Sequence, residues 1–473
     1  MRLALTCLML LTTLLQPLLG QAVQLTTGLG SADYPDYRID TNGFLHLVWH
    51  DATVDNGAVM YKLFDTAGVV RIPDIQINNS SGSANTTPVT ALDAANRLFV
   101  VWQDLADQEI YIMRLQPLLD DLDPATPAVL ATIKPVLGGV ADQVRVSSPT
   151  DGWPARNPAM AVAAGGFLHL VWESGAGGPV QYVKLDAEGQ PQTTILDLSA
   201  AAGTTGSGND LPDIAVDSAG HVHVVFTQAG ATAADEVYYA MIDGSSGALR
   251  IAPTLLSVDD GLRAGNATVS VNLADNRVYV VYKQATTLAG SGDEQIYLDA
   301  LDPALDDQNG GPADPAVMRL HRTALTSTPA QSAWHVFSRI GYDRRVHAIY
   351  MDYDAVACPS GVNYSIFNTQ ATYDGVILAN DILTQTGATL GCNPQARLAP
   401  RGDRVVWADN ATGNLEIYSA GFARADAGSR GYLTCSLGDP HAGAARAGEL
   451  WLLLAFIAIL WRWRGRRHAR NAR

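Results

Sequence analysis

The strongest constraint on the fold is a short phrase that recurs seven times along the chain. Its clear copies begin at Asp40 (DTNGFLHLVWHD), Asp93, Ala163 and Asp217, and its weaker copies begin at Leu273, Gly341 and Ala399. Each copy contains one anchoring aromatic residue, namely Trp49, Trp102, Trp172, Phe226, Tyr282, Tyr350 or Trp407. These residues recur at intervals of roughly fifty to seventy residues, as expected when each repeat is one four-stranded β-propeller blade.

Each repeat has the same order of strands and turns. A short apolar strand comes first and is often opened by proline, which suits a strand's first residue. An Asp-x-x-Gly or Asp-x-x-Asn turn follows, and then a buried strand that carries the anchoring aromatic. A third strand centres on tyrosine, at Tyr61, Tyr111, Tyr182, Tyr239, Tyr297, Tyr364 and Tyr418. A less regular fourth strand completes most repeats, so the fold class is all-β, with a single seven-bladed propeller at 23–424.

The seventh repeat lacks a fourth strand before the chain becomes rich in Gly and Ala. The segment Val23 to Thr27 (VQLTT) precedes the first repeat and has the composition of such a strand. We therefore expect the N-terminal strand to complete the last blade, which closes the ring and leaves no bare sheet edge.

The N-terminus has the features of a secretion signal. Arg2 precedes an apolar stretch, and small residues near Ala22 offer a cleavage site, so residues 1–22 are predicted to be a signal peptide. The formal net charge of the chain is −16, although six arginines lie in the last twelve residues. This acidic balance excludes a nucleic-acid partner, which needs a basic face.

The C-terminus carries a second targeting element. A Gly/Ala-rich linker at 425–448 contains Cys435, an apolar helix is predicted at 449–463, and a basic cytoplasmic tail follows at 464–473. The strictly apolar part is short for a bilayer span, and the arginines favour a cytoplasmic C-terminus. The order of cysteine, helix and arginines resembles the MYXO-CTERM, GlyGly-CTERM and JDVT-CTERM sorting tails. That resemblance implies removal of the helix by a processing protease, with Cys435 retained; the alternative is a permanent membrane anchor.

Two further cysteines, Cys358 and Cys392, lie in loop-like settings near the sixth and seventh repeats. An exported protein meets an oxidising compartment, so these two are expected to form a disulfide. Two cysteines without neighbouring histidines make a poor zinc site, and no metal ligands are assigned.

Three arginines align on the first strands of neighbouring repeats. Arg38, Arg339 and Arg397 share one position, where the other repeats have alanine or valine. Grouped near the channel, they predict either an anion-binding mouth or salt bridges between blades, with Asp36, Asp343 and Asp403 as the partners.

The phrase D-x-x-G-x-x-H-x-V-W resembles the secreted sialidase-like propellers, which hold a substrate carboxylate with three arginines. That resemblance implies an enzyme acting on acidic sugars, with Tyr37, Tyr342 and Asp343 nearest to the arginines in sequence. The chain departs from the family pattern, which has six blades. No repeat contains the full S-x-D-x-G-x-T-W box, and Arg71-Ile72-Pro73 falls on a predicted outer strand.

Two other residue sets were weighed for metal binding. His46, His169, His223 and His347 recur three residues before the anchoring aromatic, where other repeats have Phe or Tyr, so this is a packing position. Acidic stretches at 120–123 and 302–314 are candidate calcium loops whose spacing fits only in part. No cofactor is expected, with calcium as the alternative.

These features predict an exported cell-surface protein that binds a glycan, a peptide or an envelope protein without catalysis. One alternative is a sialidase-like glycoside hydrolase or lyase acting on acidic sugars. The other is a structural surface or adhesion component. Fold alone does not rank them, because propellers support both binding and catalysis.

Overall fold

The computed structural model describes the residues 23–27, 31–55, 57–78, 85–115, 143–147, 154–175, 178–202, 211–230, 234–287, 294–307, 310–326, 334–341, 344–354, 363–384, 398–401, 404–409 and 416–421. The chain divides into two units after Ala423, and the second unit lies outside these residues. Within the described part, no helix is long and apolar enough to cross a membrane. The predicted helix at 449–463 is not among the described residues.

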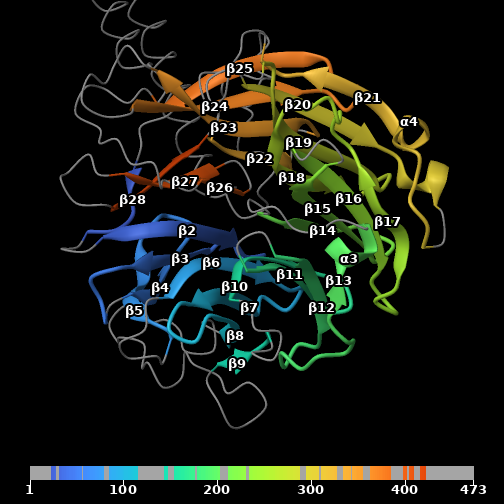
Figure 1. Cartoon of the computed structure of the whole chain (residues 1–473). Coiled ribbons are helices and arrows are strands. Elements are labelled where there is room, and N and C mark those ends of the chain that lie inside the picture. Colours follow the sequence, from blue (N-terminus) through green and yellow to red (C-terminus); the bar gives the residue numbers. More distant parts are fainter. Residues whose placement is uncertain are drawn as a thin grey trace, which may run out of the picture. The chain divides into compact units, whose positions relative to one another are not determined.

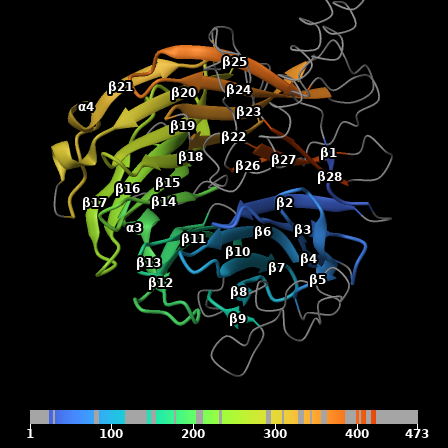
Figure 2. The ribbon, with the colours of Figure 1, turned by 180° about the vertical axis from the view of Figure 1, so that it is seen from behind.

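The described strands form seven antiparallel sheets of four strands each, arranged around a central channel (Figures 1 and 2). Blade 1 contains β2 (Ala32–Ile39), β3 (Leu45–Asp51), β4 (Ala58–Phe64) and β5 (Val70–Gln76). Blade 2 contains β6 (Asn85–Leu92), β7 (Leu98–Asp104), β8 (Glu109–Leu115) and β9 (Val144–Arg145). Blade 3 contains β10 (Ala155–Val162), β11 (Leu168–Ser174), β12 (Val180–Leu185) and β13 (Leu196–Asp197).

The remaining blades repeat this order. Blade 4 contains β14 (Asp213–Val216), β15 (His221–Ala229), β16 (Asp235–Asp243) and β17 (Leu249–Leu255). Blade 5 contains β18 (Ala264–Asn272), β19 (Arg277–Ala285), β20 (Glu294–Leu301) and β21 (Arg319–Ala324). Blade 6 contains β22 (Trp334–Ile340), β23 (Val346–Asp354), β24 (Asn363–Ala371) and β25 (Ile377–Thr384). Blade 7 contains β26 (Leu398–Arg401), β27 (Arg404–Asp409), β28 (Glu416–Gly421) and, from the other end of the chain, β1 (Val23–Gln24).

The expected closure of the ring is confirmed. Strand β1 pairs antiparallel with β28, with Val23 opposite Ser419 and Gln24 opposite Tyr418. The seventh sheet therefore takes its outermost strand from the start of the chain, and its edge is paired as in the other blades.

A side-chain cap marks the same place in six blades. A backbone N–H among the first three residues of the third strand donates to a Ser, Thr or Asn side chain that follows the fourth strand. The capping residues are Asn78, Ser147, Ser199, Ser257, Thr326 and Thr26. In blade 7 the cap is Thr26, directly after β1, so this segment has the contacts of a fourth strand as well as its pairing.

The tight turns after the innermost strands form as the sequence indicates. Asp40 Oδ1 accepts the backbone N–H groups of Asn42 and Phe44 at 2.9 and 2.8 Å, and Gly43 adopts a φ of 83°. Asp93 makes the same pair of bonds in blade 2, where Asn96 takes the left-handed position with a φ of 58°. Only Gly and a few polar residues adopt this conformation readily, which explains the Gly or Asn at the turn.

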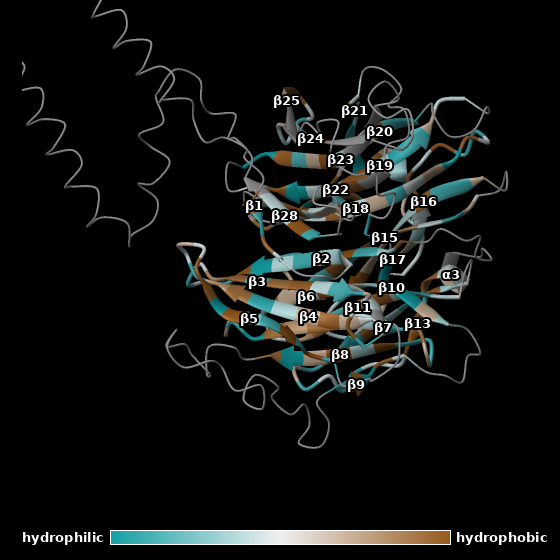
Figure 3. Cartoon of the chain, turned by 90° about the vertical axis from the view of Figure 1, so that its left-hand side faces the viewer, coloured by the Kyte–Doolittle hydropathy of each residue, from teal (hydrophilic) through white to brown (hydrophobic). Residues whose placement is uncertain are grey.

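The core lies between neighbouring blades, where the apolar faces of successive sheets pack (Figure 3). In five blades the anchoring aromatic stacks on an aromatic directly opposite on the third strand: Trp102 on Tyr111, Phe226 on Tyr238, Tyr282 on Tyr297, Tyr350 on Phe367 and Trp407 on Tyr418.

The third-strand tyrosines occupy more than one register. Tyr111 and Tyr418 lie opposite the anchoring aromatic, whereas Tyr61, Tyr182 and Tyr239 lie opposite the residue before it. Tyr364 pairs with Tyr353, further along the strand.

The predicted calcium loop at 302–314 is built from helix caps and an ion pair. Asp302 caps the 3-10 helix η3 (Pro303–Asp306), and Asp314 caps α4 (Pro315–Met318). Asp307 bonds to Arg250 of blade 4. In the part of the chain that the structure describes, no group of three or more His, Cys, Asp or Glu side chains is placed to hold a metal ion. The other candidate loop, 120–123, is not described; α3 (Leu198–Ala202) is the remaining helix.

Candidate functional site

The channel is lined by the innermost strands, and four of these strands share one irregularity. Tyr34, Thr87, Asn157 and Asn266 have left-handed φ values of 49°, 52°, 49° and 51°. Each lies at a register shift between the first and second strands of its blade, with a proline directly after it in the first three cases. Such a bulge turns the start of the strand and places the side chains that follow it into the channel.

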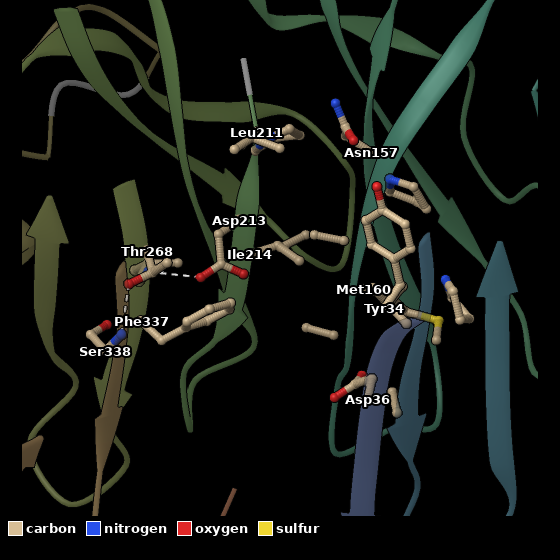
Figure 4. A pocket seen from close by; sticks show the side chains of 18 of the residues that line it. Tyr34, Asp36, Asn157, Met160, Leu211, Asp213, Ile214, Thr268, Phe337 and Ser338 are labelled. Carbon is tan, nitrogen blue, oxygen red and sulfur yellow. Dashed lines mark hydrogen bonds between the residues drawn. The ribbon is translucent and has the colours of Figure 1, made fainter. Parts of the chain in front are cut away.

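Between these strands lies a cavity of about 410 Å³. Its walls come from the innermost strands of blades 1 to 6 and combine aromatic, aliphatic and polar groups. Tyr34, Met160, Leu211 and Phe337 supply apolar surface, and Asp36, Asn157, Asp213, Thr268 and Ser338 supply hydrogen-bonding groups (Figure 4). A cavity of this size and mixed lining is typical of small-ligand sites.

Side chains that face the channel join neighbouring blades at one level of the cavity. We call it the middle level; it contains Asp36, Asp213, Thr268 and the residues at the same position in the other innermost strands. Asp36 accepts both the backbone N–H and the hydroxyl of Thr90 from blade 2, at 2.7 and 2.9 Å. Asp213 accepts the backbone N–H of Val269 from blade 5 at 2.9 Å. The next contact repeats the geometry with a hydroxyl, because Thr268 Oγ1 accepts the N–H of Ser338 at 2.6 Å.

Arg38 lines this cavity but is paired. Its Nη1 lies 3.2 Å from Asp36 Oδ1 and 3.0 Å from the backbone oxygen of Tyr37. The pair is partly screened from solvent, so the carboxylate offsets the guanidinium charge where a ligand would meet it. Asp36 was named as a possible salt-bridge partner, but this contact lies within blade 1 and does not join two blades.

The other two arginines of the predicted group are placed differently. Arg339 is 7% exposed and lies opposite His347, the register that Arg38 has opposite His46. Arg397 lies outside the described residues. In blade 7 the residue that corresponds to Arg38 is Arg401. It lies opposite Arg404, three residues before Trp407, just as Arg38 lies opposite His46, three residues before Trp49.

Tyr34, which lines the cavity, forms an aromatic pair with His50. The rings of Tyr34 and His50 lie 6.2 Å apart, and Asp33 Oδ1 accepts the Tyr34 backbone N–H at 2.7 Å. Burial lowers the pKa of His50 against the charge of Asp51, so its imidazole is held in the neutral form. Nearby on blade 3, Asn157 Nδ2 donates to the buried Glu173 at 2.9 Å.

The recurring histidines are internal to the blades. Nδ1 of His46, His169 and His223 lies 3.0, 2.7 and 2.8 Å from the hydroxyls of Tyr61, Tyr182 and Tyr239. His347 instead meets Asn368 at 3.1 Å. In blade 2 the position of the histidine is taken by Phe99 and the position of the tyrosine by Ile112, so both members of the pair are apolar there.

Of the three residues that the sialidase-like interpretation named beside the arginines, the structure describes one, Tyr37. Tyr37 is fully buried in the core beside blade 7. Arg71 lies on the outermost strand β5, close to Asp65. Tyr342, Asp343, Cys358, Cys392 and Cys435 lie outside the described residues, so the disulfide and the processing site remain predictions.

Sequence reasoning named Asp36 only as a salt-bridge partner and missed Asp213 and Thr268. The position two residues after the left-handed bulge residue, or after its equivalent, is taken by Asp36, Asp213 and Thr268. Along the innermost strand, residues alternate between facing the channel and facing away from it. What the sequence lacked was a sign that these side chains reach the next blade, since each contact spans more than fifty residues of chain.

No protein-family model matches the chain, and no curated protein matches it. Among solved structures, two of a polysaccharide lyase described as the ulvan lyase of family PL25 are similar at 7% identity. They cover 85% of this chain and 96% of theirs, with TM-scores of 0.56 and, with -[GlcA(1-4)Rha3S]- bound, 0.55. A protein of unknown function from Dyadobacter fermentans matches at 11% identity over 85% of this chain and 97% of its own, with a TM-score of 0.46. At these identities the likeness to the lyase shows a common propeller fold.

Proposed function

We propose that the chain is an exported saccharide-binding propeller whose ligand occupies the central channel. The observation that carries this proposal is the 410 Å³ cavity between the innermost strands, with Tyr34 and Phe337 beside several hydrogen-bonding groups. Sugars present apolar C–H faces and many hydroxyls, and a lining of this kind complements both.

The charges around the cavity favour a neutral saccharide. Asp36 offsets the charge of Arg38, and Asp213 adds a second carboxylate to the wall. A ligand carboxylate or sulfate would meet these groups at close range, whereas a hydroxyl donates to an acid and accepts from an N–H.

The similar propellers add circumstantial support. The PL25 ulvan lyase acts on a polysaccharide and has been seen with a bound saccharide. That protein shares the architecture and not the sequence, so it supports the class of ligand and not its identity.

The test is a binding screen of the full-length chain against immobilised neutral and acidic glycans, followed by calorimetry. We expect neutral glycans to bind and Tyr34→Ala to reduce the affinity. Arg38→Ala should leave neutral-glycan binding in place. Binding only to acidic glycans, lost in Arg38→Ala, would instead support an anion-binding mouth; no binding by folded protein would favour a protein partner or a structural role.

A second candidate is cleavage of a glycan by elimination or hydrolysis. It is favoured by one observation, the neutral His50 beside the cavity-lining Tyr34, since such a pair is able to remove and return a proton. Incubation with polysaccharides should then release reducing ends or ultraviolet-absorbing unsaturated products. Activity that persists in both His50→Ala and Tyr34→Phe would exclude this pair.

Export and surface display rest on the sequence of the two termini. The signal peptide at 1–22 and the tail from Cys435 onward would place the propeller outside the cell, either anchored or released by a processing protease. Mass spectrometry of the mature protein from its native host would decide between them, because processing removes residues 449–473.

A further inference from the structure

Three of the contacts between neighbouring innermost strands follow one rule. The middle-level side chain of one blade accepts the backbone N–H of the residue one position further along in the next blade. Asp36 does so for Thr90, Asp213 for Val269 and Thr268 for Ser338. The corresponding residues of blades 2 and 3 are Val89 and Ala159, whose side chains have no acceptor atom.

The donors that face these two residues are the N–H groups of Met160 and Ile214. In blade 3, Ala163 N–H donates to the Phe167 oxygen at 2.9 Å, so pairs along this hairpin alternate from there between bonded and non-bonded. Met160, opposite Leu170, falls on a non-bonded pair, and its N–H points away from its own blade.

The same count applies in blade 4. Asp217 N–H donates to the His221 oxygen at 2.9 Å, and Ile214 lies opposite Val224 on a non-bonded pair. Within the described residues, neither the Met160 nor the Ile214 N–H has a hydrogen-bond partner. Both residues line the cavity and are only 7% and 6% exposed.

A buried backbone N–H without a partner is costly, and native structures satisfy nearly all of them. Two such donors on neighbouring strands of one cavity therefore need acceptor atoms, which water supplies in an open channel and which oxygen atoms of a bound molecule can replace. We infer that the N–H groups of Met160 and Ile214 form a subsite that binds hydroxyl or ring oxygens of a neutral saccharide. This inference rests on the proposed function and specifies where in the channel the sugar is held.

The chain itself supplies the design of the test. Thr268 shows that a threonine at the middle level accepts the N–H of the next blade, and threonine has nearly the shape of valine. Val89→Thr should therefore occupy the Met160 N–H, and Ala159→Thr should occupy the Ile214 N–H. The matched control for the second change is Ala159→Val, which has the same bulk and no acceptor.

The probes are the neutral trisaccharides cellotriose, xylotriose and arabinotriose, titrated into the full-length chain by calorimetry. For any that bind, we expect Val89→Thr to weaken binding relative to the native chain, and Ala159→Thr relative to Ala159→Val. The expected loss is roughly three- to tenfold for each hydrogen bond. In protein labelled with ¹⁵N-methionine, the Met160 amide signal, assigned with Met160→Leu, should shift on titration in the native chain and not in Val89→Thr.

The outcomes separate the two proposals. Equal affinities in the threonine and valine variants, with an unmoved Met160 signal, would overturn the subsite and leave saccharide binding in place. Failure of the native chain to bind any saccharide would remove the proposed function and the subsite together.

Discussion

The side chain of Thr26 donates a hydrogen bond to the side chain of Glu416, 390 residues later in the chain. The same Thr26 hydroxyl accepts the backbone N–H of Ile417 at 2.9 Å. Ser147 with Glu109 and Ser257 with Glu236 make the corresponding contact in blades 2 and 4, so the junction of the two chain ends has the construction of an ordinary blade.

Removal of the Thr26 hydroxyl should therefore weaken the closure of the ring. Thr26→Ala leaves the buried Glu416 carboxylate and the Ile417 N–H without their partner, which costs about 1–3 kcal/mol in the free energy of unfolding. Chemical denaturation monitored by tryptophan fluorescence measures the change. Thr27→Ala is the matched control, because Thr27 is exposed and should have almost no effect.

The buried carboxyl of Glu236 should make stability depend on pH. Burial raises the pKa of Glu236 to about 7, against the hydrogen bond from Ser257. The folded state then holds a proton that the unfolded state has already lost, so this group's contribution to stability falls as pH rises from its ordinary pKa towards 7. We expect Glu236→Gln to raise the melting temperature above that pH and to leave it nearly unchanged in mild acid. A gain of the same size at both pH values would contradict the assignment.

The carboxylate of Asp299 is fully buried between two arginines of blade 5. Its oxygens lie 3.0 Å from Arg319 Nε and 2.8 Å from Arg322 Nε, and Arg322 also donates to the Leu256 backbone oxygen of blade 4. Loss of one partner from a buried ion pair costs about 3–5 kcal/mol, so Asp299→Asn should be strongly destabilising in urea unfolding.

The same blade offers the control for this change. Asp275 pairs with Arg277 at 3.7 Å, and both side chains are more than a third exposed. Asp275→Asn should change the free energy of unfolding by less than about 1 kcal/mol. Similar effects from the two substitutions would show that burial of Asp299 does not determine its contribution.

The histidine–tyrosine pairs predict strong coupling between two positions. His169→Phe leaves the buried Tyr182 hydroxyl unpaired and Tyr182→Ile leaves the imidazole unpaired, each costing about 1–3 kcal/mol. The double change reproduces Phe99 and Ile112 of blade 2 and should cost less than either single change. A double-mutant cycle measures the coupling, and additive effects would contradict it.

The same histidine has a pH signature. Burial lowers the pKa of His169 to about 4, with the charge of Lys184 acting in the same direction. The unfolded state therefore takes up a proton first as pH falls, and stability is lost from the ordinary histidine pKa downward. We expect His169→Phe with Tyr182→Ile to reduce the slope of melting temperature against pH in this acidic range. An unchanged slope would show that His169 stays accessible to protons.

The blade count and the closure were predictable because they depend on local chemistry repeated many times. Each Asp turn, each proline and each anchoring aromatic independently indicates the same order of strands and turns. The registers of Tyr61 and Tyr111 were not predictable in the same way. Neighbouring positions on a buried third strand both accept tyrosine, and only the partner, His46 in one case and Trp102 in the other, distinguishes them.

The candidate site was harder to predict from the sequence than the fold. The alignment placed Arg38 and Arg339 at one register, and Arg38 lines the cavity. The sequence named Asp36 as a possible salt-bridge partner but did not show that the pair would form within one strand. The unpaired donors at Met160 and Ile214 are backbone atoms with no sequence signature. They follow only from the strand register and from the absence of an acceptor on blades 2 and 3, both of which need three-dimensional structure.

The shared seventh blade also sets an order of events in time. The strand β1 is the first part of the propeller to leave the ribosome or cross a membrane, and its partner β28 is the last. Blades 1 to 6 are complete in themselves and are able to fold as they emerge. The first strand must wait for nearly the whole domain, so ring closure is the slow, long-range step, as expected for contacts of high sequence separation.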